Sequence, residues 1–534
     1  MKKSISLFLL LFATLMGVKA QDVKITGKVT EAGNNAPVES ASISVKGKSK
    51  GVSSNANGDF SLSVPAGSTI IVSSVGYQKR EVTATSESMT IALTKDANNL
   101  ADVVVVGYGT QKRGNITSAV TVIKGAELTK RPLASTSMTL QGLAPGVVVQ
   151  QGSGQPGADG GSINIRGYGS ITGSSSPLII ADGVEGVSLN DIDPNAIESI
   201  TILKDAASTA IYGVRGTNGV ILIKTKRAIS GKTSIAFNSF ISKQTPTNFP
   251  KLLSSIDHML LQNEGDLNAA PLAAPTYSQT QIDLYRNNAA NNLSIFDTDW
   301  KDLIFQNNGM MQNHNLIISG GSEKASFLVS GTVLDQQGLV VNNRFKKYDL
   351  RLNGDVNFTS KVKFTTDIFY TKAINVRPAG MSVNEIIQRG ISMARIFPGK
   401  FGEGQYGDAG QSNQINPVGA AEASGISRAE TPTLSLRFAL SAEIFKNFIL
   451  DASYNNRTSY TESYTARGTY NSFNPNPITG TYLFNKVIGD SALSYTNNRL
   501  NTNQYNISGN YSFNVRNKHD IKRVITRYVI LICI

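Results

Sequence analysis

The segment Tyr348 to Phe358 reads YDLRLNGDVNF, and apolar and polar residues alternate along it. The apolar set is Tyr348, Leu350, Leu352, Val356 and Phe358, and the polar set is Asp349, Arg351, Asn353, Asp355 and Asn357. Because successive side chains of a β-strand point to opposite faces, this pattern predicts a strand with one apolar face and one charged or amide face.

The same alternation recurs along the C-terminal half of the chain. It returns at 434–444 and 505–513, and further candidate strands are 233–242, 312–320, 325–333, 361–370 and 448–454. Strands of about 10 residues, with tyrosines near their ends, are typical of an outer-membrane barrel with lipid outside and water inside. The alternative is a soluble β-sandwich, whose strands usually have about 5 to 6 residues.

The connections between these strands also favour the barrel. Long polar connections at 244–311, 373–431 and 455–501 alternate with short ones at 321–323 and 359–360. Outer-membrane barrels have long loops at one end and short turns at the other. We therefore expect residues 232–516 to form the N-terminal part of a transmembrane antiparallel β-barrel.

The N-terminus predicts export from the cytoplasm. Residues 1–20 combine Lys2 and Lys3, an apolar stretch from 5 to 18 and a small-residue cleavage site that ends at Ala20. The single cysteine, Cys533, is far from any lipobox position, so we expect neither a lipoprotein nor a disulfide framework. Past residue 20 no apolar run is long enough to cross a bilayer as a helix, so the mature protein is periplasmic, secreted, or inserted in the outer membrane as strands.

The charge of the chain is basic, with 51 Lys and Arg against 38 Asp and Glu and a net charge of +13. Such a balance suits nucleic acid or an anionic membrane surface. The nearest approach to a compact basic cluster is 518–527, in the C-terminal tail. We therefore expect no nucleic-acid partner.

Residues 22–98 predict a small β-sandwich, because short alternating strands are separated by Gly and Asn turns. The succession GKVT, Pro37-Val38 with ASISVKG, GDFSL at 58–62 and SVGY at 74–77 resembles the carboxypeptidase regulatory-like domain. That domain is an accessory module, and the zinc ligands of a metallopeptidase are missing.

Residues 115–227 are glycine-rich and mix strands with short helical stretches, which predicts a small α+β domain. Residues 199–219 indicate a strand followed by a helix over Asp205 to Ile211 that stops near Gly213.

Between these two domains lies the segment 102–113, DVVVVGYGTQKR. Four valines favour a strand, but the glycines and the Gln111-Lys112-Arg113 run that follow predict that it has no packed sheet of its own. A lone extended strand exposes N–H and C=O groups with which another protein can pair by β-augmentation. The alternative, a buried strand of the next domain, remains open on residue type alone.

Three motifs that suggest a ligand have simpler explanations. Gly152 to Gly157 satisfies GxGxxG, but Pro156 and the absence of a following helix indicate a turn cluster. Asp191, Asp193 and Asn195 begin like a calcium loop, but the positions that need Gly and Glu hold other residues, which indicates a capped turn before a strand. The three histidines lack partners at ligand spacing, so no cofactor, metal or catalytic residue, and no enzyme, is predicted.

The order of these parts resembles the SusC/RagA family of TonB-dependent outer-membrane receptors. The matching stretches are VVVVGYGTQKR, 146–157, 164–167, 192–202, Leu203-Lys204-Asp205-Ala206, Ile211-Tyr212-Gly213, 215–221 and NHNLIISGGSEKASFLVSG. The resemblance implies a TonB box made of Asp102, Val103, Val104, Val105, Val106, Gly107, Tyr108, Gly109, Thr110 and Gln111. It also implies that 115–227 is a plug domain with the motif residues Arg166, Gly167, Lys204, Asp205, Tyr212, Gly213, Arg215, Gly216, Asn218 and Gly219.

The resemblance further implies nutrient uptake through a barrel of about 22 strands. The ligands expected by resemblance are oligosaccharides or oligopeptides, and the expected partners are TonB with ExbB and ExbD, a SusD/RagB-like lipoprotein and outer-membrane lipid. Two alternatives are a surface binding or adhesion protein and a siderophore receptor. The segments 103–106 and 203–226 count against the first, and the long loops and regulatory-like extension count against the second.

One departure from the family concerns length, because its chains run to nearly twice this one. The alternation stops after Asn514, and 517–534 combine a basic run with YVILICI. This pattern predicts an aberrant tail from a frameshift or premature stop. We expect the polypeptide expressed alone to be degraded or to aggregate, and a heat-modifiable band in outer membranes would contradict this.

Overall fold

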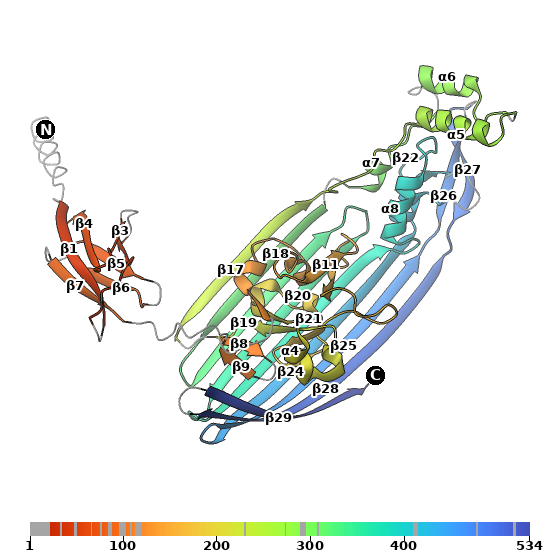
Figure 1. The fold of residues 1–534 in the computed structure, drawn as a ribbon. Helices are drawn as coiled ribbons and strands as arrows, with labels where there is room; N and C mark the ends of the chain where they lie inside the picture. Colours follow the sequence, from red (N-terminus) through yellow and green to blue (C-terminus); the bar gives the residue numbers. More distant parts are fainter. Residues whose placement is uncertain are drawn as a thin grey trace, which may run out of the picture. The chain divides into compact units, whose positions relative to one another are not determined.

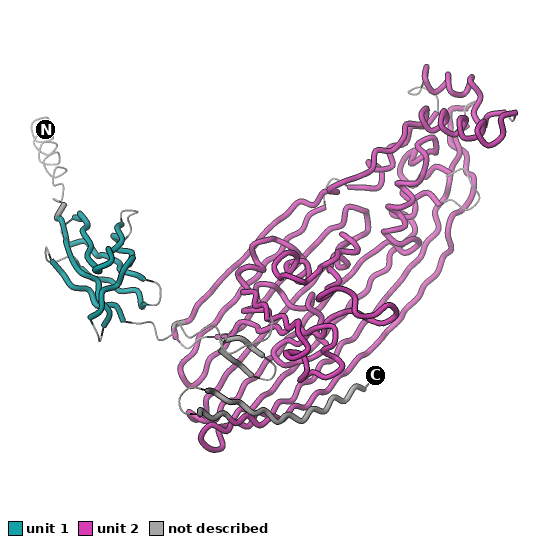
Figure 2. The backbone as a smooth tube through the Cα atoms, viewed as in Figure 1, with its two compact units in different colours: residues 1–104, 111–115 teal, residues 105–110, 116–534 magenta. Residues whose placement is uncertain are grey.

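The computed structural model describes residues 22–32, 35–46, 51–65, 67–74, 77–83, 88–94, 103–106, 109–112, 120–228, 231–272, 274–288, 295–306, 309–408, 415–476, 479–515 and 519–533. The chain forms two compact units, one of residues 1–104 and 111–115 and one of residues 105–110 and 116–534 (Figure 2). Within the described residues, no helix has both the length and the apolar character needed to span a membrane.

The first unit contains the expected β-sandwich. One sheet has the order β4 (Asp59–Pro65), β1 (Asp22–Glu31), β7 (Ser88–Leu93), and the other has the order β3 (Gly51–Ser53), β2 (Ser42–Val45), β5 (Thr69–Ser73), β6 (Arg80–Thr83). Val29 and Leu93 from the first sheet and Ile43 and Ile70 from the second are fully buried in one core. The short alternating strands therefore pack their apolar faces together, as a sandwich requires.

The second unit begins with a small α+β domain, here called the plug. Its five-stranded sheet has the order β10 (Val120–Lys124), β15 (Ile197–Leu203), β16 (Val220–Thr225), β13 (Leu178–Ala181), β14 (Val184–Glu185), and a second sheet pairs β11 (Val147–Gln151) with β12 (Gly161–Ile165). The short helices are α2 (Gly125–Leu128), α3 (Thr136–Thr139) and α4 (Ala206–Thr209). The helix expected at 205–211 begins at Ala206 and passes into the 3-10 helix η4 (Ala210–Gly216).

The central plug strands are apolar on both faces because both faces are covered. Ile200, Ile202 and Leu203 of β15 are fully buried, as are Val220 and Ile221 of β16. A strand in this position takes a nearly continuous run of branched apolar residues rather than an alternation.

The rest of the second unit is a large antiparallel sheet, here called the wall (Figure 1). Its order is β17 (Gly231–Gln244), β18 (Gly309–Gly321), β19 (Ala325–Gln337), β20 (Arg344–Asn357), β21 (Val362–Pro378), β24 (Gly425–Phe445), β25 (Phe448–Arg467), β28 (Ala492–Val515), β29 (His519–Cys533). The eight strands predicted from the alternation are all present. The mainly β fold with a sandwich, a plug and barrel strands is therefore confirmed.

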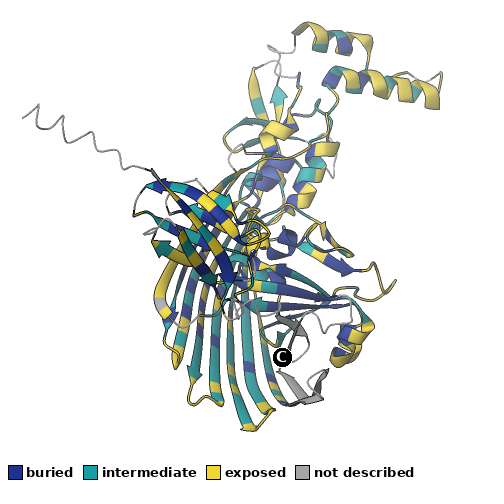
Figure 3. Ribbon diagram, turned by 60° about the vertical axis from the view of Figure 1, so that its left-hand side comes forward, coloured by how far each residue is buried: buried dark blue, intermediate teal, exposed yellow. Residues whose placement is uncertain are grey.

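The two faces of the wall are distinguished by what they contact. On β20 the odd-numbered residues Arg351 and Asp355 bond to plug residues, so this side is the inner face. The even-numbered Leu350 and Leu352 point the other way and are 53% and 39% exposed. Figure 3 shows this alternation of burial along the strands. The apolar face of the opening segment is thus the outer face of the wall.

The predicted polar connections are shorter than expected, because several strands continue into them. β25 runs to Arg467 and β28 begins at Ala492, although 455–501 was expected to be a connection. In the second half of β25 and the first half of β28, both faces carry Asn, Thr, Ser and Tyr. The alternation of apolar and polar residues is therefore lost there. The backbone ladder nevertheless continues through 20 strand residues of β25.

The remaining connections fold around a small apolar core of their own. It contains Trp300 from α7 (Trp300–Ile304), Ile386 from α8 (Val383–Ser392), Val418 from α9 (Pro417–Glu422) and Tyr470 from β26 (Tyr470–Asn476). The other elements here are α5 (Ser255–Ala269), α6 (Gln279–Asn288), β22 (Lys400–Gly402), β23 (Gln405–Gly407) and β27 (Thr481–Ile488). The prediction of polar connections missed these elements, including α8, in which Val383 and Ile386 are buried at helical spacing.

The C-terminal segment, predicted as an aberrant tail because the alternation stops after Asn514, forms a strand. β28 continues to Val515, and β29 pairs antiparallel with it over His519 to Cys533. The segment lacks clean alternation but is rich in Ile, Val and Tyr, residue types that favour extended backbone whether or not they alternate.

Candidate functional site

The predicted lone strand at Val103–Val106 has a partner. It forms β8, which lies in a two-stranded sheet with β9 (Gly109–Lys112). Asp102, Gly107 and Tyr108 lie outside the described residues, and nothing is described of the side chains of β8 and β9. The expectation of a strand without any partner was therefore wrong, although the segment does stay out of the sandwich and plug sheets. Two candidate strands separated by two residues with a glycine are a hairpin signal that the interpretation missed.

The described plug motif residues gather at one end of the five-stranded sheet. Leu203, the last residue of β15, pairs with both Val120 and Val220. Lys204 and Asp205 follow Leu203, and Asn218 and Gly219 precede Val220. The ends of three strands thus bring together residues that are distant in the sequence.

Polar contacts hold this corner of the plug. Arg166 forms an ion pair with Asp205, and Lys204 donates to the carbonyl oxygen of Pro145. Asn218 Nδ2 donates to the carbonyl oxygen of Ser174 at 2.8 Å. Burial and the neighbouring Arg166 guanidinium hold the pKa of Lys204 below its usual value.

Three further motif residues act through packing or pairing. Tyr212 is 4% exposed and packs with Leu203 and Val220. Arg215 forms an ion pair with Glu185, and a Cβ at Gly216 would lie 2.9 Å from the carbonyl oxygen of Thr209.

Three motif glycines allow backbone that other residues rarely adopt. Gly167, Gly213 and Gly219 have φ of +92°, +58° and +89°. Arg166 also has a positive φ, of +59°, and its amide donates to the carbonyl oxygen of Gly146 at 2.8 Å. This part of the motif therefore preserves a chain path with several left-handed residues.

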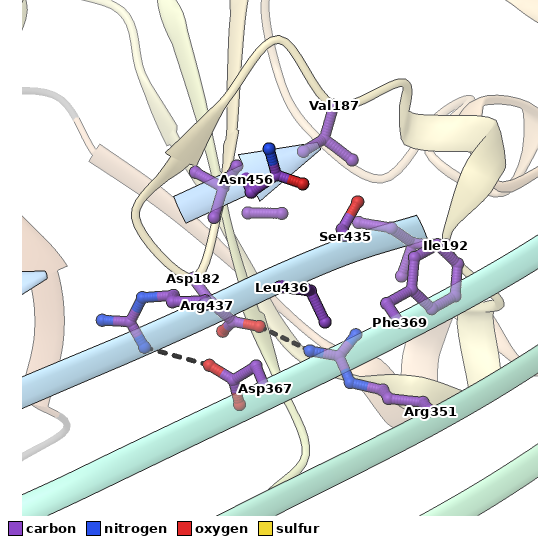
Figure 4. Close-up of a pocket in the computed structure, with 12 residues that line it drawn as sticks. Asp182, Val187, Ile192, Arg351, Asp367, Phe369, Ser435, Leu436, Arg437 and Asn456 are labelled. Carbon is purple, nitrogen blue, oxygen red and sulfur yellow. Dashed lines mark hydrogen bonds and ion pairs between the residues drawn. The ribbon is translucent and has the colours of Figure 1, made fainter. Parts of the chain in front are cut away.

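A second group of residues, absent from the sequence predictions, joins the plug to the wall. It consists of the charged residues Asp182, Arg227, Arg351, Asp355, Asp367 and Arg437 and is here called the plug–wall cluster. Arg351 Nη2 lies 2.7 Å from Asp182 Oδ2, and Arg437 Nη1 lies 3.0 Å from Asp367 Oδ2 (Figure 4). Arg227 Nη2 lies 2.7 Å from Asp367 Oδ1. Three guanidinium groups therefore meet three carboxylates at the junction.

The cluster is buried or half-buried, and its members make further hydrogen bonds. Arg351 is 8% exposed, and it also donates to Thr225 Oγ1 at 2.6 Å. Thr225 in turn donates to Asp182 through its amide at 3.0 Å and its hydroxyl at 2.6 Å. Buried charges need such partners, because an unpaired charge in a low-dielectric site is costly.

Other polar contacts extend the junction along the wall. Lys347 Nζ donates to the carbonyl oxygen of Asn190 at 3.0 Å, and Arg457 Nη2 lies 2.7 Å from Asp191 Oδ2. Gln504 Nε2 donates to the carbonyl oxygen of Gly183 at 3.2 Å. Strands β20, β25 and β28 therefore all hold the plug segment 183–191.

Sequence reasoning recognised the charged face of β20 but assigned it to water. The charge of Arg351, which lies between Leu350 and Leu352, was visible, but its partner Asp182 is 169 residues away. One signal was present in the sequence. The inward positions of β20 carry both acidic and basic residues rather than only neutral amides, which indicates that this face contacts another part of the protein.

The pH dependence of the junction follows from Asp182. Burial by itself raises the pKa of this carboxyl, but Arg351, Arg227 and the bonds from Thr225 outweigh it, so its pKa lies below the usual value. A lowered acid pKa contributes stability that is full above the unfolded value of about 3.9 and is lost as pH falls through the folded pKa. We expect the urea concentration at which the plug becomes sensitive to protease to decrease when the pH is lowered below about 4. In Asp182→Asn this decrease should be smaller. An equal acid response in both proteins would contradict the assignment.

The motifs set aside as turns are turns. Asp193 Oδ1 accepts from the amide of Asn195 at 2.6 Å and caps η3 (Pro194–Ala196), directly before β15. Gly157, at the end of the GxGxxG match, has a φ of +67°. The described residues contain no group of three or more His, Cys, Asp and Glu side chains arranged to hold a metal ion.

Comparison with protein families gives two matches. Residues 112–220 match the TonB-dependent Receptor Plug Domain, and residues 25–106 match the CarboxypepD_reg-like domain. The second match agrees with the regulatory-like sandwich expected from its strand and turn pattern.

Curated relatives match over more than half of the chain. TonB-dependent receptor P3 of Formosa agariphila is 34% identical over 372 residues, which are 69% of this chain and 35% of that protein. TonB-dependent receptor SusC of Bacteroides thetaiotaomicron is 32% identical over 369 residues, which are 66% of this chain and 34% of that protein. The chain thus spans about a third of the length of these relatives.

Solved structures share the fold. The RagAB peptide importer in its open-open state matches with a TM-score of 0.64 at 24% identity, over 80% of this chain and 49% of that one. The RagAB peptide transporter matches with a TM-score of 0.64 at 22% identity, over 78% of this chain and 48% of that one.

Proposed function

Because this chain belongs to the SusC/RagA family of TonB-dependent receptors of the cell outer membrane, we propose that it takes part in nutrient uptake driven by TonB. The observation that carries the proposal is the plug–wall cluster. It holds a separately folded domain against the inner face of barrel strands. A wide barrel needs such a plug to close its lumen.

Uptake requires that the plug can be displaced, and the outer membrane has no ATP to supply the work. In our proposal, TonB, energised by ExbB and ExbD, binds Asp102 to Gln111 and pulls on the plug. Among the described residues β8 and β9 pair only with each other, so each strand has a second edge that a partner strand can extend by β-augmentation. Val120 begins the plug sheet soon after this segment, so the force reaches β10 first.

The motif corner has a defined role in this proposal. Arg166, Gly167, Lys204, Asp205, Tyr212, Gly213, Arg215, Gly216, Asn218 and Gly219 maintain the end of the sheet where β10 meets β15. They determine the plug's shape and touch no reacting group, so we propose no enzymatic role for them.

We propose the ligand and the lipoprotein partner from the relatives. The RagAB structures are named a peptide importer, and SusC gives the family its other name. We propose an oligosaccharide or oligopeptide as the ligand and a SusD/RagB-like lipoprotein as the partner over the connections that contain α5 to α9. In this proposal the domains are the signal peptide 1–20, the regulatory-like domain 22–98, the TonB box and linker 102–113, the plug 115–227 and the barrel strands from 232.

A backbone change in β8 tests the energy coupling. Val104→Pro removes an amide donor and restricts the backbone. We expect uptake of a radiolabelled oligosaccharide or oligopeptide mixture to fall to background, with binding to intact cells unchanged. Val104→Ile, which keeps the donor, is the matched control and should transport normally. Normal uptake by the proline variant would refute a β-augmented TonB contact.

A further inference from the structure

The outer face of the wall changes character sharply along β20. From Phe358 to Tyr348 its residues are apolar, and Leu350 is 53% exposed. Ten residues at about 3.3 Å each, tilted by about 40°, span about 25 Å, which matches the apolar band of an outer-membrane barrel. Tyr348 therefore marks one border of the bilayer, at the end of the wall where the long connections lie.

Just beyond that border the outer face becomes cationic. Arg344 is paired across the ladder with Val376, and Lys346 with Ile374. Val376 is in turn paired with Arg428. Because opposed residues of a ladder share a face, these three cations all point away from the plug, and Lys346 and Arg344 lie about 7 and 13 Å past Tyr348 along the strand.

These residues line a recess of about 550 Å³ that opens on the outer face, here called the cationic recess. Its floor includes Arg344, Lys346, Tyr348 and Arg428, and its far side is the segment Gly338–Asn343 with Gln306. The amide of Gln306 donates to the carbonyl oxygen of Leu339 at 2.6 Å, which fixes that far side. The recess is therefore bordered on this side by a segment that a backbone hydrogen bond holds in place.

The charges around the recess do not balance. Lys346 and Arg344 share Asp335, at 3.4 Å and 2.5 Å. Glu430 forms ion pairs with both Arg428 and Lys372, each at 2.6 Å. Lys372 is paired across the ladder with Pro432 and so lies one row nearer the apolar band. In these pairs four cations share two carboxylates, and the next acidic residue on this face is Glu462, across the ladder from Glu430. Arg344 and Arg428 remain 42% and 47% exposed at their side chains, so both can reach a further anion.

We propose that the cationic recess binds the phosphate-bearing headgroup of a lipid in the outer leaflet, with its acyl chains on the apolar band below Tyr348. The position supplies both parts of such a ligand's environment, since an anion-binding recess lies directly above an exposed apolar face. Basic pockets beside membrane-spanning elements recognise lipid headgroups in this way. The proposal depends on the outer-membrane setting and not on which nutrient is imported.

The test uses the receptor recovered from outer membranes in mild detergent. The probes are a diacylated glucosamine disaccharide with one phosphate, the same lipid without the phosphate, and inorganic phosphate. Native mass spectrometry measures the lipid retained. We expect the wild type to retain about tenfold more of the phosphorylated lipid than of its phosphate-free form. Equal retention would overturn the proposal, and so would displacement by millimolar inorganic phosphate, which indicates an adventitious anion site.

The informative variant is Lys346→Ala with Arg428→Ala. It leaves Arg344 with Asp335 and Lys372 with Glu430, so each of these two carboxylates keeps one cation and none is left over for a further anion. We expect retention of the phosphorylated lipid to fall about tenfold, to the level of the phosphate-free lipid.

Two further variants control for folding and for total charge. Lys346→Arg with Arg428→Lys keeps the charge and should keep lipid retention. Lys324→Ala with Lys446→Ala removes two exposed cations from the short turns at the other end of the wall and should have no effect. A loss in this last variant equal to the loss in the recess variant would show that total charge, not the recess, governs retention. Resistance of the plug to protease, equal to that of the wild type, confirms that each variant is folded.

Discussion

Replacing Arg351 by methionine is expected to destabilise the attachment of the plug by about 3 to 5 kcal/mol. Arg351 is buried, and it bonds both Asp182 and Thr225 of the plug. Its loss leaves the Asp182 carboxylate buried without its nearest cation. Arg227 still acts on Asp182, so we expect an effect near the lower end of that range. The measurement is the urea concentration at which a protease begins to cleave the plug.

Two comparisons separate this effect from a general loss of charge. Asp182→Asn combined with Arg351→Met removes both partners, and we expect it to recover part of the loss, since no unpaired charge remains. Arg467→Met removes an exposed cation that lies 3.3 Å from Asp490, and its effect should stay below about 1 kcal/mol. An Arg351 variant no more labile than the Arg467 variant would show that the cluster does not hold the plug.

Replacing Gly219 by alanine is expected to destabilise the plug by about 2 to 5 kcal/mol, from backbone strain and overpacking together. Gly219 has a φ of +89°, and a Cβ there would lie 2.7 Å from Ile165 Cδ1 and 3.2 Å from the carbonyl oxygen of Leu203. The Ile165 side chain must move to admit the methyl group, and the Leu203 carbonyl must give by a few tenths of an ångström. Loss of protease resistance in the plug, at lower urea than in the wild type, is the expected readout.

Gly142→Ala is the matched control for strain alone. Gly142 has a φ of +79°, and among the described residues nothing lies within 4 Å of a Cβ built at this position. Its substitution should cost about 1 kcal/mol, because only the backbone preference changes. If the two variants are equally stable, close packing at the motif corner is not what requires Gly219.

The wall was predictable because its two faces meet different surroundings. Leu350 and Leu352 point outward and Arg351 points inward, so apolar and charged residues alternate with a period of two in the sequence of β20. The same reasoning failed where that contrast ended. In the upper part of β25, residues such as Asn456 and Thr458 are polar although the ladder continues, and β29 forms without alternation.

One part of the candidate site could be predicted from the sequence and the other could not. The plug motif was recognisable only by its resemblance to a known family, whose matching stretches are short and continuous in the sequence. The structure explains Gly219 by its backbone and its neighbours. The plug–wall cluster was not recognisable. Asp182, Arg227, Arg351 and Asp367 come from four separate segments, and each one alone resembles an ordinary solvated charge.

The sequence by itself determined the order of the domains, eight of the nine described strands of the wall and the apolar face of those strands where the alternation is clear, because those properties depend on neighbours within a few residues. Only the tertiary structure decided that the inward charges hold a plug and that the outward cations of β20 and β24 share one recess. Electrostatic partners are chosen by distance in space, and ladder pairing brings together residues such as Arg344 and Arg428 that are far apart along the chain.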